Sequence, residues 1–240
     1  MVKKKKNLKM PKLPFKKLGI IVLIIVFAVV IFNFREIIFN PYPAIVNLYK
    51  MRYNQMSTSD YLEKLRAFAN GSLVLVGTDQ SGNSLKLSIN DSLVGLNYSQ
   101  LLDWEHRHLM YWTGELQVRP EMPIEILTTN IIIQGQDFIA LGRCGEFSLL
   151  YNGLLLANDY RSRIVVDCSV STDGRVADDH VWVEIYLPEN DTWLHCDPTE
   201  KIFNQPDMYG NPAKWNKCVN LVYGIEGNEI VNLTEKYQFK

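Results

Sequence analysis

The stretch that decides the fold is "GRCGEFSLLYNGLLLAN", residues 142–158. It places one thiol, Cys144, between two glycines at the start of a leucine-rich run. The leucines predict a helix from Cys144 to about Ala157. A cysteine at a helix N-terminus meets backbone N–H groups and the positive end of the helix dipole, and both favour the reactive thiolate. By itself the pattern also fits a small packing residue, so other parts of the chain must show whether Cys144 is a nucleophile.

Three strand candidates follow this helix. They are "RIVVDCSV" at 163–170, "HVWVEIYL" at 180–187 and "TWLHCDP" at 192–198. Short turns between them favour antiparallel pairing. A helix followed by antiparallel strands predicts an α+β fold, with helices on one side of an antiparallel sheet.

Polar residues alternate along two of these strands. Because successive side chains point to opposite faces, His180, Trp182 and Glu184 are expected to share one face. By the same rule Asp197 shares a face with His195, for which we expect a packing role. A cysteine nucleophile needs a base, and the base needs an acceptor that orients it. Cys144, His180 and Asp197 supply these types, although a surface histidine and a turn-forming aspartate are the simpler alternatives.

Several motifs in this region resemble the transglutaminase-like superfamily, which has a papain-related cysteine fold. The first is the cysteine stretch quoted above, and the others are "DHVWVEIY" at 179–186 and "WLHCDPTE" at 193–200. They are most similar to the peptide:N-glycanase branch of that superfamily. The likeness extends to "NQPDMYG" at 204–210 and covers roughly residues 100–237. It implies a transglutaminase-like core with the nucleophile at a helix N-terminus.

The resemblance also implies roles for individual residues. Cys144 would be the nucleophile, His180 the base and later the acid, and Asp197 the residue that orients His180. Trp182 and the Cys144 backbone N–H would lie near the developing oxyanion. Glu146 and Glu184 match acidic positions of the motifs, where we expect supporting roles behind the catalytic residues.

One departure from that branch concerns metal. The branch carries two C-x-x-C pairs that bind a structural zinc ahead of the nucleophile, whereas residues 113–143 of this chain contain no cysteine. No metal and no other cofactor is therefore expected. The remaining cysteines allow two pairings in an oxidising compartment, Cys168 with Cys196 or Cys196 with Cys218.

The N-terminus predicts a membrane anchor. Residues 1–17 hold eight lysines and no acidic residue, and an apolar segment follows at 18–34. This segment is long enough for a single span once its flanks are counted. The lysines place the N-terminus in the cytoplasm and the rest of the chain outside. A cleaved signal peptide is the alternative.

The rest of the chain divides into two regions. Residues 35–98 are predicted to form a tether over 40–58, then a short helix from Ser59 and a β-hairpin. Residues 99–240 form the predicted catalytic domain. It opens with a helix over 98–113, passes through the irregular "RPEMPIEIL", and ends in a hairpin around Gly227 and Asn228.

These observations predict a membrane-anchored thiol amidohydrolase that acts on a protein or glycopeptide substrate. Removal of a glycan from asparagine is the reaction that the resemblance implies. A cysteine peptidase or a protein transamidase would use the same triad. A catalytically silent, anchored binding protein is the alternative from a different class. The net charge of -1 gives no argument for a nucleic-acid partner.

Overall fold

The computed structural model describes residues 42–79, 82–88, 92–116, 119–134, 137–170, 176–210 and 221–237. The chain divides into a unit at Met1–Pro43 and a second unit at Ala44–Lys240. Among the described residues, no helix combines the length and apolarity that a membrane span needs. The predicted anchor at 18–34 lies outside the described residues.

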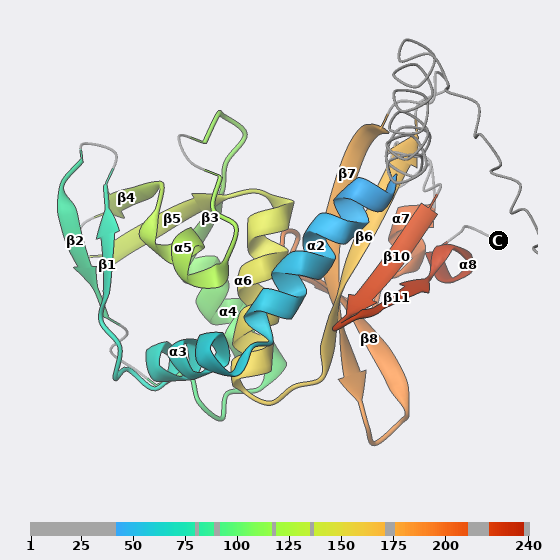
Figure 1. Cartoon of the computed structure of the whole chain (residues 1–240), viewed down its shortest axis with the longest axis horizontal. Coiled ribbons are helices and arrows are strands. Elements are labelled where there is room, and N and C mark those ends of the chain that lie inside the picture. Colours follow the sequence, from blue (N-terminus) through green and yellow to red (C-terminus); the bar gives the residue numbers. More distant parts are fainter. Residues whose placement is uncertain are drawn as a thin grey trace, which may run out of the picture. The chain divides into compact units, whose positions relative to one another are not determined.

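The second unit is built around a six-stranded antiparallel sheet (Figure 1), in the order β11-β10-β6-β7-β8-β9. Its strands are β6 (Ser162–Val170), β7 (Val176–Leu187), β8 (Thr192–Asp197), β9 (Ile202–Phe203), β10 (Leu221–Glu226) and β11 (Glu229–Asn232). The three predicted strands and the predicted final hairpin are all present. The α+β class predicted from the order of helix and strands is therefore confirmed.

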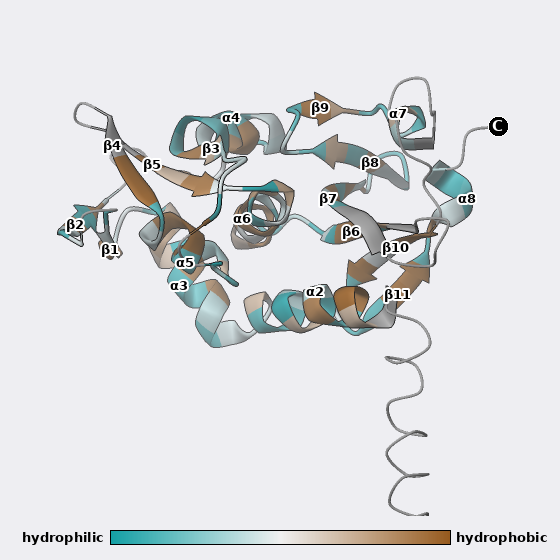
Figure 2. Cartoon of the chain, turned by 90° about the horizontal axis from the view of Figure 1, so that it is seen from above, coloured by the Kyte–Doolittle hydropathy of each residue, from teal (hydrophilic) through white to brown (hydrophobic). Residues whose placement is uncertain are grey.

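Helix α6 (Cys144–Ala157) runs through the middle of this unit, as the leucine pattern predicts. Figures 1 and 2 show it between the large sheet and a smaller sheet. The smaller sheet has the order β3-β5-β4 and consists of β3 (Leu109–Tyr111), β4 (Ile131–Gln134) and β5 (Asp137–Gly142). Nearly every side chain of α6 is buried, since apolar neighbours surround the helix on several sides. This position holds the N-terminus of α6 rigidly between two sheets.

Further helices contact α6, and two short helices pack on the large sheet. Helices α3 (Ser59–Ala69), α4 (Tyr98–His108) and α5 (Pro123–Thr128) contact α6. The hairpin of β1 (Leu75–Thr78) and β2 (Ser84–Leu87) contacts α5 through β1. Helices α7 (Asp207–Gly210) and α8 (Thr234–Tyr237) contribute to a second apolar cluster on the sheet. That cluster contains Val165, Trp182, Tyr209, Val222, Leu233 and Tyr237.

Three predictions about residues 40–128 are wrong. Residues 42–56 of the predicted tether form helix α2 (Tyr42–Met56), because Val46, Tyr49, Tyr53 and Met56 bury one helical face. The helix predicted over 98–113 ends at His108, where β3 begins to pair with β5. Part of the predicted irregular segment is helix α5, with Pro123 in its first turn, a position where proline is tolerated.

Helix α2 reaches the segment that carries the thiol. The Tyr53 hydroxyl donates to the Ser162 carbonyl at 2.7 Å. A Cβ atom added at Gly145 would lie 2.5 Å from the Tyr49 hydroxyl oxygen. Helix α2 therefore packs directly against the first turn of α6, one residue after Cys144.

We expect Gly145→Ala to destabilise the protein because its methyl group overlaps the buried Tyr49 hydroxyl. Overpacking of this kind costs about 1–3 kcal/mol. Chemical denaturation of Gly145→Ala, Tyr49→Phe and the double variant measures the effect. Tyr49→Phe removes the overlapping oxygen. The double variant should therefore lose less free energy of unfolding than the sum of the losses in the two single variants. If the stability losses of the two single variants add up to that of the double variant, the Tyr49 hydroxyl does not limit the space at Gly145.

Candidate active site

The N-terminus of α6 is held by contacts on both sides of Cys144. The Glu146 carboxylate accepts a hydrogen bond from the Arg143 backbone N–H at 2.8 Å. The Arg143 guanidinium donates to the Gly114 carbonyl at 2.6 Å. Farther along the helix, the Ser148 hydroxyl donates to the Val181 carbonyl of β7 at 2.7 Å. Glu146 thus caps the helix that carries the thiol.

The fold brings the three predicted catalytic side chains together. Nε2 of His180 lies 2.7 Å from Oδ2 of Asp197. The Cys144 side chain forms a hydrogen bond with the same imidazole. Each ring nitrogen makes one in-plane hydrogen bond, so Nδ1 is the atom left for the thiol. Cys144 is partly exposed whereas Asp197 is fully buried, so a substrate can approach the thiol but not the carboxylate.

Charge interactions favour the protonated form of His180. Burial would lower the pKa of His180, but hydrogen bonds with Asp197 and Cys144 and their negative charges raise it to about 10. Burial would raise the pKa of Asp197, but its hydrogen bond and charge interaction with His180 hold it below the usual range. At neutral pH the site therefore contains an imidazolium beside an ionised carboxylate.

Asp197 is fixed by donors other than His180. Its Oδ1 accepts the backbone N–H of Thr199 at 2.9 Å and that of Glu200 at 3.4 Å. The Tyr209 hydroxyl donates to Oδ2, the same oxygen that His180 contacts. Burial and the Asp197 carboxylate raise the pKa of Tyr209 far above its ordinary value, which keeps this hydroxyl a donor.

Tyr209 also supports the imidazole by stacking. Its ring is stacked on Trp182, with centroids 4.6 Å apart, and on His180, with centroids 5.7 Å apart. The sequence offered one signal for this residue, because it lies in the "NQPDMYG" segment of the family resemblance. No role was predicted for it, since nothing local shows that α7 packs behind β7 and β8.

Trp182 does not occupy the predicted oxyanion position. The Cys196 side chain forms a hydrogen bond with the Tyr151 side chain of α6. Val183 lies opposite Cys196 in the β7–β8 register. That face of the sheet therefore looks toward α6, and Trp182 points to the other face. Its side chain is fully buried and its indole N–H donates to the Tyr237 hydroxyl at 3.0 Å. A buried donor that is already engaged is not available to a substrate oxygen.

Glu184 organises a network behind Trp182. Its fully buried carboxylate contacts the Arg163 guanidinium, and it accepts from the Lys236 ammonium and the Tyr237 hydroxyl, both at 2.5 Å. Since Tyr237 also accepts from Trp182, this network fixes the ring on which His180 packs. The supporting role expected for Glu184 stays a prediction.

His195 packs in the same region and is neutral. Its side chain is 1% exposed, and burial lowers its pKa to about 4. Its ring lies 5.1 Å from Tyr209 between centroids. Among the described residues its nitrogens have no hydrogen-bond partner. The packing position expected for His195 therefore agrees with its place in the fold.

The described residues hold no cluster of histidine, cysteine, aspartate and glutamate side chains that would bind a metal ion. The possible bridge between Cys168 and Cys196 is not formed, and both residues are fully buried. Cys218 lies outside the described residues, and so does any pairing that involves it.

Comparison with known proteins identifies the class of this core. Residues 116–198 match the transglutaminase-like superfamily. The chain carries a transglutaminase-like α+β core, in which a cysteine at a helix N-terminus faces a histidine and an aspartate on adjacent strands.

More specifically, part of the chain is similar in sequence to peptide N-glycanases. The human peptide-N(4)-(N-acetyl-beta-glucosaminyl)asparagine amidase is 32% identical over 99 residues, which are 41% of this chain and 14% of the human protein. The Arabidopsis thaliana protein of the same name is 31% identical over 99 residues, which are 41% of this chain and 12% of that protein. The match thus spans about a seventh of the length of such relatives.

A solved structure is also similar. A putative cysteine protease from Cytophaga hutchinsonii aligns with 76% of this chain and 53% of its own, with 17% identity and a TM-score of 0.35.

Proposed function

We propose that this protein is a thiol amidohydrolase that releases an amine from an amide bond, with the asparagine-linked glycan of a protein or glycopeptide as its substrate. The observation that carries the proposal is the contact of Cys144 with His180 and of His180 with buried Asp197. A partly exposed thiol beside an imidazolium has the charge distribution of an activated cysteine nucleophile.

The reaction proceeds in two halves. The Cys144 thiolate attacks the amide carbonyl carbon, the C–N bond breaks, and the leaving nitrogen takes the proton of His180. This gives a thioester on Cys144. Neutral His180 then takes a proton from water as the water attacks the thioester carbon, and the carboxylic acid leaves as the thiolate is restored. The N-terminal end of α6 is where the developing oxyanion is best stabilised, because the helix dipole is positive there.

The relatives' name supports the choice of substrate. They are amidases of a glucosaminyl asparagine. The match to the transglutaminase-like superfamily, residues 116–198, contains Cys144, His180 and Asp197. For this chain the reaction would convert the modified asparagine into aspartate and release a glycosylamine. The absence of the C-x-x-C pairs between 113 and 143 implies that the glycan side of the cleft differs from that of the zinc-containing branch.

We also propose that residues 18–34 anchor the enzyme in a membrane, with the catalytic domain outside the cytoplasm. The support is the apolar segment, which is uninterrupted over residues 18–32, and the lysines that precede it. Retention of the full-length chain in the membrane fraction after alkaline extraction tests the anchor, and release into the supernatant would contradict it.

The thiol reactivity tests the catalytic proposal directly. The detergent-solubilised full-length chain is treated with iodoacetamide across pH, and Cys144 modification is followed by peptide mass spectrometry. We expect Cys144 to be alkylated faster than a model thiol at the same pH, because it lies beside the His180 imidazolium. His180→Ala should slow this reaction by about tenfold or more, because the imidazolium no longer stabilises the thiolate. Fully buried Cys168 and Cys196 provide unreactive internal references.

A matched histidine variant separates general damage from loss of activation. His108→Ala removes a ring that stacks on Trp104, and it should leave Cys144 alkylation unchanged. Glycopeptide, unglycosylated peptide and peptide plus a primary amine are then offered as substrates. Deglycosylation with conversion of asparagine to aspartate supports the proposal. Reaction only with peptide, or only with added amine, would replace it by a peptidase or transamidase. If the alkylation rate of Cys144 is the same in His180→Ala as in the unmodified chain, a catalytically silent binding protein is favoured.

A further inference from the structure

Large apolar side chains are exposed next to the nucleophile, on β3 and just beyond it. Met110 is 39%, Tyr111 49% and Trp112 36% exposed. Tyr111 lies opposite Gly142 in the parallel β3–β5 register, and the Trp112 N–H donates to the Gly142 carbonyl at 2.8 Å. Gly142 is two residues before Cys144, so backbone pairing holds Tyr111 and Trp112 next to the segment that carries the thiol.

Tyr111 is close enough to Cys144 for the charge of that residue to affect its hydroxyl. Burial raises the pKa of Tyr111, and the charge of Cys144 raises it further. The Tyr111 ring also lies 6.5 Å, between centroids, from that of Phe147 in the first turn of α6. Tyr111 therefore borders Cys144 while about half of its surface remains accessible.

Trp112 is held in place although it is exposed. Its indole N–H donates to the Glu115 carbonyl at 3.3 Å. A Cβ atom added at Gly114 would lie 2.6 Å from the same indole nitrogen, so the ring rests on this glycine. Gly114 is tied through its carbonyl to Arg143, the residue before Cys144. An exposed ring held by such contacts loses little freedom on binding a ligand, which is typical of a recognition residue.

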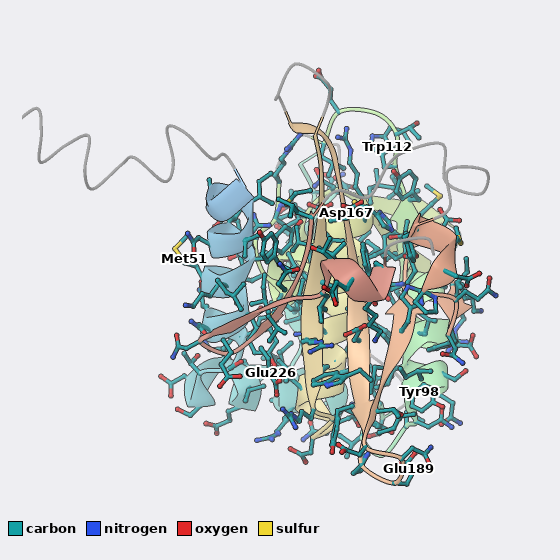
Figure 3. All side chains as sticks on the ribbon, turned by 90° about the vertical axis from the view of Figure 1, so that its right-hand side faces the viewer. Met51, Tyr98, Trp112, Asp167, Glu189 and Glu226 are labelled. Carbon is teal, nitrogen blue, oxygen red and sulfur yellow. The ribbon has the colours of Figure 1, made fainter. Side chains whose placement is uncertain are left out.

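The position of these rings indicates which part of a substrate they meet. Figure 1 shows β3 on one side of α6 and β7, which carries His180, on the other. The leaving amine must lie on the His180 side, because it takes its proton there. The acyl chain departs from the carbonyl carbon in another direction, and β3 lies on the side of α6 that is opposite to β7. Figure 3 shows Trp112 at the same end of the domain as Asp167, the cross-strand neighbour of His180.

We propose that Tyr111 and Trp112 form a binding surface for the acyl side of the substrate, namely an apolar or aromatic side chain of the polypeptide that becomes the thioester on Cys144. This inference rests on the proposed amidase function and adds to it a determinant of specificity. The rings contact the polypeptide rather than the released amine, so they select among protein sequences around the reacting amide.

Peptidyl chloromethyl ketones test the surface without requiring a leaving amine. The Cys144 thiolate displaces chloride from the methylene carbon, and the rate constant kinact/KI reports recognition of the peptide. Two probes are compared, one with phenylalanine beside the reactive group and one with only glycines. Tyr111→Ala and Trp112→Ala should each lower kinact/KI for the phenylalanine probe about tenfold. Their rates with the glycine probe and with iodoacetamide should stay near those of the unmodified chain.

Two further variants make the test specific. Gly114→Ala displaces the Trp112 ring without altering an aromatic residue, so it should reproduce the loss, whereas Trp112→Phe should retain most of the rate. Val231→Ala changes a side chain of similar exposure, 38%, on β11, and should have no effect. Melting curves confirm that each variant is folded.

Each other outcome would overturn the inference. Unchanged phenylalanine-probe rates in all variants would show that the surface is not used. Equal losses with iodoacetamide would show that the rings only support the thiol. Protection of Cys144 by free N-acetylglucosamine oligosaccharide that depends on Trp112 would assign the surface to the glycan. Failure of the amidase proposal is distinct, since it shows as an unactivated Cys144 with iodoacetamide in the unmodified chain.

Discussion

Replacing Cys144 with alanine is expected to lower kcat/KM for amide hydrolysis by roughly 10⁴-fold or more, because this change removes the thiol proposed to form the covalent acyl intermediate. Cys144→Ser should be almost as inactive. An ordinary serine hydroxyl stays protonated beside an imidazolium that already carries its proton, and His180 in this state cannot act as a base. The measurement is the rate of asparagine-to-aspartate conversion in a glycopeptide, followed by mass spectrometry.

Both variants should fold normally. Cys144 is partly exposed at the first position of α6, and the contacts that cap the helix come from Glu146 and Arg143. Melting temperatures near that of the unmodified chain would therefore accompany the loss of activity. Cys168→Ala serves as the thiol control, because this fully buried residue on β6 should not be needed for turnover. Retention of substantial activity by Cys144→Ala would rule out covalent catalysis by this residue.

Asp197→Asn is the second substitution with a large expected effect. The buried carboxylate accepts from His180, Tyr209, Thr199 and Glu200. An asparagine has only one oxygen, so its amide N–H groups must face some of these donors in either orientation. Loss of the negative charge also removes a main stabiliser of the imidazolium. By analogy with other triads, kcat should fall roughly 10³- to 10⁴-fold with a smaller change in KM.

The pH profile distinguishes this electrostatic role from a structural one. In the unmodified chain His180 keeps its proton until pH approaches its pKa of about 10, so activity should decline only at strongly alkaline pH. Asp197 raises the pKa of His180, and Asp197→Asn must therefore move the alkaline limb to lower pH. Tyr209→Phe removes one donor and leaves the charge, and we expect a loss of only about tenfold. An unchanged alkaline limb in Asp197→Asn would contradict the proposed coupling.

Much of this arrangement is local in origin and could be predicted from sequence. The leucines after Cys144 specify α6, and the alternation along 180–187 and 192–197 specifies two strands and the faces of His180 and Asp197. Side-chain periodicity depends on the backbone of a single segment. For that reason the elements, and the candidate set of Cys144, His180 and Asp197, were accessible without a structure.

Other features arose only from contacts between distant segments. Val46, Tyr49, Tyr53 and Met56 face one side of α2, but the prolines at 41 and 43 suggested a tether until the packing against α6 was visible. The predicted helix over 98–113 is cut short at Leu109 because this residue pairs with Ala140 of β5. Pairing partners outside a segment can override its local preference.

The difference between what local sequence patterns predict and what tertiary contacts decide is clearest at Trp182. Alternation along β7 correctly placed Trp182 on the face of His180, but it carries no information on what covers that face. Tyr209 of α7 and Tyr237 of α8 lie 27 and 55 residues later. The Tyr209 ring stacks on Trp182, and the Tyr237 hydroxyl accepts the indole N–H of Trp182. The sequence by itself determined the catalytic residue types and their order along the chain. Tertiary structure alone decided which of their neighbours meet the substrate, because burial depends on segments that local patterns do not connect.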